Sequence, residues 1–572
     1  MNFRKEKTRI AYFSMEIGLD SKIPTYSGGL GVLAGDTIRS CADLNVPIIA
    51  VTLLYRDGYF RQKLDAYGNQ EELASEWNPG ELLALLPVKV SVQIETRTVS
   101  VQAWEYLVTG IGGHVVPVIF LDADVPENGA YDRSLTHCLY GGDDKYRLCQ
   151  EVILGVGGVR MLKELGYHEI VRYHMNEGHS SLLTLELLNE RKKSGAGRKR
   201  VDKIDDTRSD WDVDGVRRMC VFTTHTPVPA GHDQFSYSLV SQVFGDFIPV
   251  DFLKQIGGGD TFNMTLLAMN LSHYENGVAK EHGKVSQVLY PGYHIDSITN
   301  GIYSANWVCD SFKGLFDKYI PGWRNDPFSL RYALSIPKEE IWSAHREAKR
   351  ELIDYTNAKA NAGMDGEVLT IGFARRATAY KRANLVFSDV ERLTSIAGTS
   401  GRVQFIFSGK AHPRDMQGKE LIKQVVAVSR RLGDQVRVAY LENYDMELAR
   451  MLIAGADLWL NTPRKPEEAS GTSGMKAAHN GVPSLSILDG WWIEGCIEGL
   501  TGWSIGTVVA EESSDVEDAG YLYDRLEKVV IPTFYGNRDR WIEMMRHSIA
   551  INGSFFNTHR MVLQYVLNAY TY

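Results

Sequence analysis

Short apolar runs alternate with longer amphipathic patterns along most of the chain. In the first half, strand-length runs such as RIAYFSM, VPIIAVTLLY, HVVPVIFL, IVRYHM and RMCVFTTH are separated by helical patterns such as GVLAGDTIRSCADL and YRLCQEVILGVGGVRMLKELG. Apolar runs separated by helices are typical of parallel strands that are buried on both faces. The pattern therefore predicts an α/β protein with a mostly parallel sheet.

The same alternation resumes after residue 365. The runs VLTIGFA, VQFIFSG, VRVAYLE, DLWLNT and VPSLSIL alternate with helical patterns, of which one is expected to start at Arg382. Turns and a long helix separate the two halves of the chain. We therefore predict two Rossmann-like domains facing one cleft, residues 1–320 and 321–572, with C-terminal helices that cross back to the first domain.

Length and charge narrow the class of protein. A chain of 572 residues is too long for one hydrophobic core. Its net charge of −9 gives no overall attraction to nucleic acid or to an anionic membrane, so we expect neither as a partner. Six cysteines without a C-x-x-C pair argue against a disulfide framework or a thiolate zinc site, and we expect no metal.

The N-terminal residues MNFRKEKTRIAYFSMEIG lack the apolar run of a signal peptide, and no stretch approaches the ~20 apolar residues of a membrane span. We therefore expect a cytoplasmic protein. Because the chain begins almost at its first strand, we also expect no N-terminal phosphorylation switch.

One segment, residues 192–218, interrupts the alternation. Its sequence, KKSGAGRKRVDKIDDTRSDWDVDGVRR, is charged and nearly free of apolar residues. Such a composition predicts a solvated surface insertion.

The stretch EASGTSGMKAAHNG, from Glu468 to Gly481, follows a strand-like run and opens a helix. A helix start offers unpaired N–H groups and the positive end of the helix dipole to an anion. Lys476 does not fit the G-K-[ST] order of a nucleotide-binding P-loop. The lysine either pairs with a phosphate, does covalent chemistry or is an exposed helix residue. The small residues before it, which let backbone approach a ligand, are Gly471, Thr472, Ser473 and Gly474.

A basic cluster, GFARRATAYKRANL, follows the run VLTIGFA. Arg375, Arg376, Lys381 and Arg382 would lie at the carboxyl end of a parallel strand, where open α/β sheets bind ligands. The alternative is a solvated basic loop.

A glycine-rich segment, YSGGLGVLAGD, contains Gly29, Gly31 and Ala34 in the order G-x-G-x-x-A. The preceding strand-like run ends about a dozen residues earlier, which does not suit a dinucleotide fingerprint. We predict a turn that opens a helix and holds phosphate or sugar oxygens by its amides.

Further polar residues follow predicted strands in the first half. They are Glu16, the NEGH residues Asn176, Glu177 and His179, and the histidines His225 and His232 of HTPVPAGH. Singly, each histidine is more often structural than catalytic, and Glu16 is either a general base or a turn cap.

Together these segments resemble the α-glucan phosphorylases of the compact prokaryotic type. The resemblance runs from about Ile10 to Trp503, and EASGTSGMK is its most specific element. The other matching motifs are SGGLG, RLCQEVILGVGGVR, HMNEGHSS, THTPVPAG, NLSHYENGVAKEHGKVS, SITNGI, ARR with YKRANL, FSGKAHP, LENY and LDGWW. The family's fold is of glycosyltransferase-B type, which agrees with the two α/β halves.

The resemblance implies phosphorolysis of an α-glucan such as glycogen, starch or maltodextrin. Inorganic phosphate would release the terminal α-1,4-linked glucose as α-D-glucose 1-phosphate with retention, and the enzyme would be a homodimer. Pyridoxal 5′-phosphate would be carried as an imine on Lys476, with its phosphate as proton donor and acceptor. Two phosphates about 5 Å apart repel by about 3 kcal/mol per pair of unit charges at an effective dielectric of about 20. That energy keeps a shared proton between them near neutral pH.

The resemblance also implies roles for residues. Arg376 and Lys381 would hold the substrate phosphate. His225 would touch the transferred glucosyl unit, and Glu16 would join the catalytic group. The cofactor would be surrounded by Arg375, Tyr444, Gly471, Thr472 and Ser473. The substrate would contact Gly29, Leu30, Asn176, Glu177, His179, Asn300, Glu468 and Ser470.

The chain departs from the family pattern at Ala377, Ala379 and His479, which affects the expected rate and packing more than the reaction class. Three other readings remain. A glycogen or starch synthase of the same fold would use a nucleotide sugar and need no cofactor lysine. An NAD-dependent oxidoreductase would leave EASGTSGMK unexplained. A catalytically inactive glucan-binding protein would keep the motifs without turnover.

Overall fold

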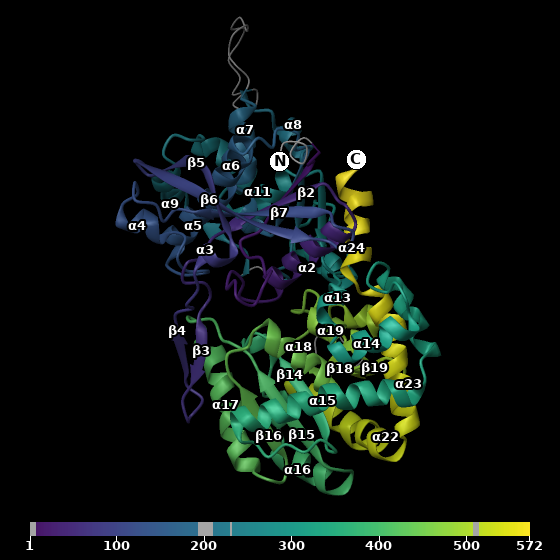
Figure 1. The fold of residues 1–572 in the computed structure, drawn as a ribbon. Helices are drawn as coiled ribbons and strands as arrows, with labels where there is room; N and C mark the ends of the chain where they lie inside the picture. Colours follow the sequence, from purple (N-terminus) through teal and green to yellow (C-terminus); the bar gives the residue numbers. More distant parts are fainter. Residues whose placement is uncertain (1–6, 193–209, 229–230, 507–513, 572) are drawn as a thin grey trace, which may run out of the picture.

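The computed structural model describes residues 7–192, 210–228, 231–506 and 514–571. Two α/β domains lie one above the other in Figure 1. Within these residues, each domain is built on one large sheet with helices on both faces. The prediction of an α/β fold with two Rossmann-like halves is confirmed.

The first sheet has nine strands in the order β13-β12-β9-β8-β1-β2-β7-β6-β5 across the described residues. Its strands are β1 (Ile10–Phe13), β2 (Ile48–Leu53), β5 (Ala84–Ile94), β6 (Arg97–Thr109), β7 (Val115–Asp122), β8 (Arg172–Asn176), β9 (Cys220–Thr223), β12 (Tyr274–Gly277) and β13 (Asp296–Ser297). Pairing is parallel from β13 to β7. The pairs β5–β6 and β6–β7 are antiparallel.

The second sheet is parallel throughout, in the order β16-β15-β14-β17-β18-β19. Its strands are β14 (Leu369–Ala374), β15 (Val403–Ser408), β16 (Arg437–Leu441), β17 (Leu458–Asn461), β18 (Ser484–Ile487) and β19 (Gly502–Ile505). All residues of β14, β15, β17, β18 and β19 are buried. This burial on both faces explains why these strands have continuous apolar sequences.

The helices of the first half are α2 (Gly29–Asp43), α3 (Pro79–Leu82), α4 (Ala130–Ser134), α5 (Asp144–Val152), α6 (Gly158–Glu164), α7 (Leu183–Glu190), α8 (Val213–Arg217), α9 (Tyr237–Phe244), α10 (Val250–Gly257), α11 (Met264–Asn270), α12 (Lys280–Leu289) and α13 (Ser304–Trp307). Those of the second half are α14 (Asp310–Tyr319), α15 (Lys338–Ala360), α16 (Val390–Thr399), α17 (Met416–Leu432), α18 (Met446–Gly455), α19 (Thr472–His479), α20 (Trp492–Gly495), α21 (Asp515–Arg525), α22 (Ile531–Gly536), α23 (Arg538–His547) and α24 (Thr558–Tyr565). In the ranges given above, no helix is long and apolar enough to cross a membrane.

The chain crosses between the domains twice. Helix α14, which precedes the predicted boundary at residue 320, already packs in the second core through Phe312 and Phe316. Helix α24 returns to the first domain, where Ser40 Oγ lies 2.6 Å from Thr558 Oγ1 (Figure 1). The assignment of residues 1–320 and 321–572 to two domains stays a prediction.

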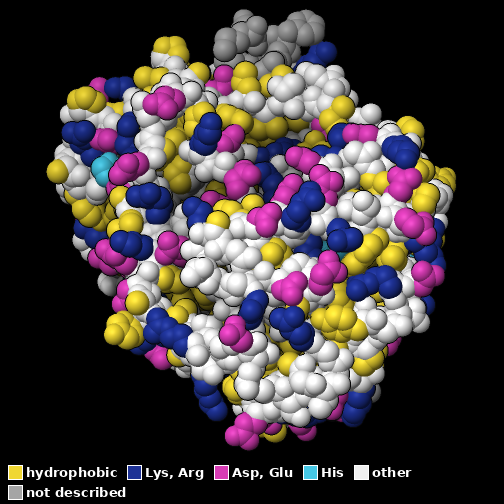
Figure 2. Space-filling view, turned by 60° about the horizontal axis from the view of Figure 1, so that its bottom comes forward, with side chains coloured by type: hydrophobic (Ala, Val, Ile, Leu, Met, Phe, Trp, Pro, Cys, Tyr) yellow, Lys and Arg dark blue, Asp and Glu magenta, His cyan; other side chains and the backbone are white. Residues whose placement is uncertain are grey.

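A hairpin of β3 (Arg61–Leu64) and β4 (Gln70–Leu73) extends from the first domain along the second (Figure 1). The Gln62 Nε2 donates to the Gly409 carbonyl at 2.9 Å, and the Gln70 Nε2 donates to the Ala411 carbonyl at 2.9 Å. These bonds join the domains on the side opposite α24. The mixed surface of Figure 2 has acidic and basic side chains interspersed on the face it shows.

Two sequence predictions are wrong in detail. The helix expected from Arg382 begins at Val390, because Arg382 adopts a left-handed conformation with φ 47°. Its guanidinium donates to the Thr462 and Pro463 carbonyls and pairs with Asp518. Arg382 thus closes a turn instead of propagating a helix.

The solvated insertion predicted at residues 192–218 is also corrected in part. Residues 193–209 lie outside the described residues. The end of the segment forms α8, and Trp211 is only 5% exposed because its ring stacks on Phe252 with centroids 5.3 Å apart. Trp211 and Val216, at the described end of this segment, are therefore core residues.

Candidate active site

Lys476 lies on α19, which follows β17 at the carboxyl edge of the second sheet. The helix begins after Gly471, whose φ of 85° is left-handed, and no side chain caps its first turn. The Lys476 side chain is buried, with Nζ 3.7 Å from the centroid of the Trp307 ring. Burial lowers the pKa of Lys476 to about 8, with Asp36 opposing the change and Arg450 adding to it. A buried amine of this kind is partly unprotonated near neutral pH and can act as a nucleophile.

Two side chains of the basic cluster converge on Glu468. The Lys381 Nζ lies 2.7 and 2.6 Å from the two Glu468 carboxylate oxygens, and the Arg375 Nη1 lies 2.8 Å from Oε2. Burial raises the pKa of Glu468, but Lys381 and Arg375 outweigh it and lower the pKa to about 2. Burial, together with Arg375, lowers the pKa of Lys381 to about 8. The alternative of a solvated basic loop does not hold for these two residues.

The third cation, Arg376, faces the glycine-rich turn of the first domain. Its Nη2 donates to the Ser27 hydroxyl at 3.1 Å. A Cβ atom at Gly28 would lie 2.9 Å from the same nitrogen, so a larger residue there would displace the guanidinium. Around Gly29, by contrast, the space is open, with no described atom within 4 Å of an added Cβ. Leu30 continues the same turn into α2.

Glu16 lies beneath this turn and is fully buried. Its carboxylate accepts hydrogen bonds from the Ser27 and Gly28 amides and, at 2.9 Å, from the Tyr140 hydroxyl. Of the two roles considered for Glu16, general base and turn cap, this geometry matches the turn cap. Its place in the catalytic group stays a prediction.

The polar residues that follow β8 and β9 come together. The His225 Nε2 lies 2.7 Å from Asn176 Oδ1, and the His225 amide donates to Glu177 Oε2 at 2.7 Å. Burial lowers the pKa of His225 well below its usual value, which keeps the imidazole neutral. The His179 Nε2 accepts the Met15 amide at 3.0 Å, and the predicted contact of His179 with substrate stays a prediction.

Several buried polar atoms have no hydrogen-bond partner among the described residues. They include Asn300 Oδ1 and Ser470 Oγ. Both residues are among those predicted to contact the substrate. Such orphaned atoms are rare in native proteins and are often completed by a ligand or water. Tyr444 is partly buried near Arg375. Burial raises the pKa of the Tyr444 hydroxyl, and Arg375 opposes this change.

The donor set fits a phosphate-bearing aldehyde cofactor. Lys476 supplies a buried amine, and the uncapped start of α19 directs the Thr472 and Ser473 amides outward. The Ser473 hydroxyl is already fixed by the Arg375 Nη2 at 3.2 Å and the Trp459 Nε1 at 3.1 Å. An added Cβ at Gly474 would lie 2.7 Å from the Trp491 ring, so glycine is required for this packing.

Sequence reasoning missed Asp36 and Asp489 as members of this site. The Asp489 Oδ2 accepts the Glu468 amide at 2.9 Å, and burial raises its pKa to about 7. The signal was available for Asp489, which stands in the matched motif LDGWW, and for Asp36, which ends GVLAGD.

The three departures from the family pattern are accommodated. The His479 ring is buried between Met475 O at 2.8 Å and Ser304 Oγ at 3.1 Å, and burial lowers its pKa to about 4. Ala377 forms a parallel bridge with Ala411, while Ala379 lies in a short 3-10 turn. None of these contacts blocks Lys476 or the basic cluster.

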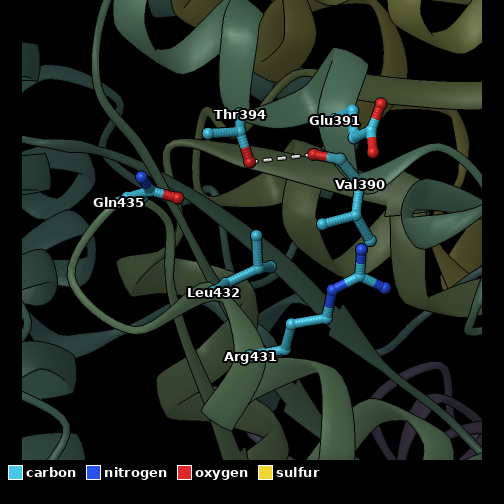
Figure 3. A pocket seen from close by; sticks show the side chains of 6 residues that line it. All are labelled: Val390, Glu391, Thr394, Arg431, Leu432 and Gln435. Carbon is cyan, nitrogen blue, oxygen red and sulfur yellow. Dashed lines mark hydrogen bonds between the residues drawn. The ribbon is translucent and has the colours of Figure 1, made fainter.

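A cavity of about 330 Å³ lies apart from these residues, between α16 and α17. Figure 3 shows its lining side chains, with the Thr394 hydroxyl donating to the Val390 carbonyl. The lining residues are Val390, Glu391, Thr394, Arg431, Leu432 and Gln435. None of them is a predicted site residue.

The two α/β domains place a buried lysine and a cationic cluster at the carboxyl edge of the second sheet. Comparison with known proteins identifies the class of protein. Residues 211–499 match the family described as "Carbohydrate phosphorylase". The chain is 41% identical to the maltodextrin phosphorylase of Thermococcus litoralis, over 100% of this chain and 71% of that protein.

Two further relatives are glycogen phosphorylases. That of Mycobacterium tuberculosis (strain H37Rv) is 37% identical over 98% of this chain and 71% of its own length. That of Aquifex aeolicus is 34% identical over 99% of this chain and 86% of its own length. The chain belongs to the carbohydrate phosphorylase family, which consists of glycosyltransferases, and the resemblance in the sequence motifs is confirmed.

Proposed function

We propose that the protein catalyses phosphorolysis of α-glucan. Inorganic phosphate releases the terminal α-1,4-linked glucose as α-D-glucose 1-phosphate with retention, and pyridoxal 5′-phosphate is held on Lys476. The observation that carries the proposal is one arrangement at the carboxyl edge of the second sheet, where the buried Lys476 amine, the uncapped start of α19 and the cations on Glu468 occur together.

The basic cluster provides for phosphate. Arg375, Arg376 and Lys381 carry three positive charges against two carboxylates, Glu468 and Glu16, so the cluster retains positive charge for an incoming anion. Arg376 and Lys381 bind the substrate phosphate, and the Gly29 and Leu30 amides complete its shell. Low local dielectric makes these contacts stronger than they would be in water.

The start of α19 provides for the cofactor. The Thr472 and Ser473 amides would hold its phosphate, with Gly471 allowing close approach, and Tyr444 would lie against the cofactor. When bound, pyridoxal 5′-phosphate supplies a phosphate that gives and takes a proton beside the substrate phosphate. Lys476 fixes the group in place, and Ser470 offers its unpartnered hydroxyl.

The first domain provides for the sugar. The neutral His225 imidazole donates from Nε2 to Asn176 Oδ1, so its Nδ1 is an acceptor that adds no positive charge. This suits a reaction in which positive charge develops on the glucosyl ring. Asn300 offers an unpartnered carbonyl oxygen to a sugar hydroxyl, and Glu177 holds the His225 backbone.

The substrates and assembly follow from the same proposal. The partners are maltodextrin or a longer α-glucan, inorganic phosphate and glucose 1-phosphate. A homodimer is part of the proposal, and light scattering on the purified protein tests it.

An assay of purified protein with maltodextrin, phosphate and pyridoxal 5′-phosphate tests the reaction. The expected product is α-glucose 1-phosphate, formed only with phosphate present and formed much more slowly by Lys381→Ala. The matched control is Lys284→Ala, since that lysine is 74% exposed and pairs only with Glu281 at 3.0 Å among described residues. Glucose transfer from a nucleotide sugar without phosphorolysis would contradict the proposal.

A further inference from the structure

One indole ring lies between the cofactor lysine and a carboxylate of the other domain. Trp307, which ends α13, donates from Nε1 to Asp36 Oδ2 at 2.7 Å. The Tyr303 amide donates to the same oxygen at 3.2 Å. Lys476 Nζ lies over the face of this ring, 3.7 Å from its centroid. A carboxylate at the ring edge and an amine on the ring face therefore share Trp307.

Both groups are buried and come from different domains. Asp36, on α2 of the first domain, is 1% exposed, and Lys476, on α19 of the second domain, is 7% exposed. Burial of a charge without a counter-charge is costly. Lys476 is therefore, with Arg39, one of two cations that favour the buried Asp36 carboxylate, and it does so across the domain interface.

The other charges around this pair are accounted for. Arg39, one turn along α2, has its Nη1 3.7 Å from Asp36 Oδ1 and also donates to the Gly18 and Leu19 carbonyls. Arg450, on α18, lies over the same Trp307 ring at 5.7 Å. Among the described residues, Asp36 is the acid that acts on Lys476, and Arg450 is the cation that opposes it.

We propose that Asp36 is a positioning residue for the cofactor lysine. Its carboxylate keeps the Lys476 amine over Trp307 and sets the proton affinity of the nitrogen that bears the cofactor. This inference rests on the proposed function for the identity of the cofactor. The proton affinity of the free amine does not depend on it.

Helix α2 thereby contacts both parts of the second domain's site. Its start, after Gly28, faces Arg376, and Asp36 two turns later faces Lys476. Since one rigid helix makes both contacts, the arrangement of the two domains and the protonation of the lysine are coupled. A nearby carboxylate favours the charged amine, so its removal lowers the pKa of Lys476 further below its usual value.

The test removes the charge and keeps the shape. In Asp36→Asn, the amide oxygen still accepts from Trp307. The matched control is Asp43→Asn on the same helix, where the carboxylate accepts from His559 at 3.0 Å and from the Ile111 amide at 2.7 Å. The readout is the pH at which Lys476 is half-modified by a small acylating reagent in cofactor-free full-length protein, followed by peptide mass spectrometry. A second readout is the pH midpoint of the absorption change in protein loaded with pyridoxal 5′-phosphate.

The expected result is a midpoint about one pH unit lower in Asp36→Asn, a tenfold loss of proton affinity, with Asp43→Asn unchanged. If the Asp36→Asn protein is recovered poorly, Asp36→Ser takes its place in the test, and the same shift of the midpoint is expected. The inference is overturned if the midpoints of Asp36→Asn and Asp36→Ser both lie within about 0.3 pH units of the midpoint of the protein without substitutions. If the unmodified protein carries no pyridoxyl group on Lys476, the proposed cofactor fails, and the acylation profile still decides the role of Asp36.

Discussion

Two buried lysines of the second domain lie at opposite ends of its sheet and differ in what surrounds the amine. Lys349, on α15, is 3% exposed, and its Nζ donates to Asp457 Oδ2 at 2.6 Å and to the Val368 carbonyl at 2.8 Å. Asp457 directly precedes β17 and also pairs with His345 at 2.8 Å. Lys476 follows the carboxyl end of β17 and faces an aromatic ring, with no hydrogen bond from Nζ to any described residue.

The difference teaches that burial alone does not mark a functional lysine. Burial raises the pKa of Asp457, but Lys349 and His345 outweigh it and hold the pKa below its usual value. Both Asp457 oxygens and the Lys349 amine are hydrogen-bonded within this cluster. The Lys476 amine is buried with its donors unused, at the sheet edge where α/β proteins bind ligands. A buried amine at that edge without a hydrogen-bond acceptor among the described residues therefore distinguishes the candidate functional lysine, Lys476, from the structural lysine, Lys349.

Replacement of Lys476 is expected to have the largest effect on activity. Lys476→Met is expected to lower phosphorolysis by about a thousandfold or more, because the anchor of the cofactor is lost. The free energy of unfolding should fall by less than the about 3–5 kcal/mol expected for loss of a buried charge's main partner, because Asp36 loses Lys476 as a counter-charge but keeps Arg39. Initial rates and urea unfolding measure the two effects. Retained turnover would remove the lysine from the chemistry.

Replacement of Lys381 tests the phosphate end of the site. Lys381→Ala is expected to lower kcat/KM for phosphate by about a hundredfold, since a charged donor to the anion is lost in a buried site. Rates at varied phosphate, with Lys284→Ala as the control, measure it. Near-normal kinetics would place Lys381 outside the phosphate site.

Replacement of Lys349 tests the supporting cluster. Lys349→Met is expected to lower the free energy of unfolding by about 3–5 kcal/mol, because Asp457 is left buried without its main partner. Activity per folded molecule should remain. Adding Asp457→Asn should recover part of the loss, and a double variant as unstable as the sum of the single variants would argue against the pairing.

The smallest expected effect is a change of kcat/KM for phosphate with pH. The pKa of Lys381, lowered to about 8, predicts that kcat/KM for phosphate falls as pH rises through 8, because the amine loses its charge. Lys381→Arg keeps its charge, so the fall should move to higher pH. An unchanged profile would assign this pH dependence to a group other than Lys381.

The sequence was informative where the local pattern carries the signal. The apolar strands of the second sheet and the small residues before Lys476 were predicted because burial on both faces and close backbone approach act on neighbouring residues. The partners of long-range charges were not predicted. The ion pairs of Glu468 with Lys381 and Arg375 were not predicted, and its contact with substrate stays a prediction. The antiparallel hairpin β5–β6 was missed because its strands have one exposed face and fewer apolar residues.

The central claim is that Lys476 bears pyridoxal 5′-phosphate, and one measurement tests it directly. An absorption spectrum of the cofactor-replete protein is recorded before and after borohydride reduction, and the reduced protein is digested and mapped. The account predicts a stable pyridoxyl group on the peptide that contains Lys476. A pyridoxyl group on a different lysine, or none in protein that has been supplied with the cofactor, would contradict it.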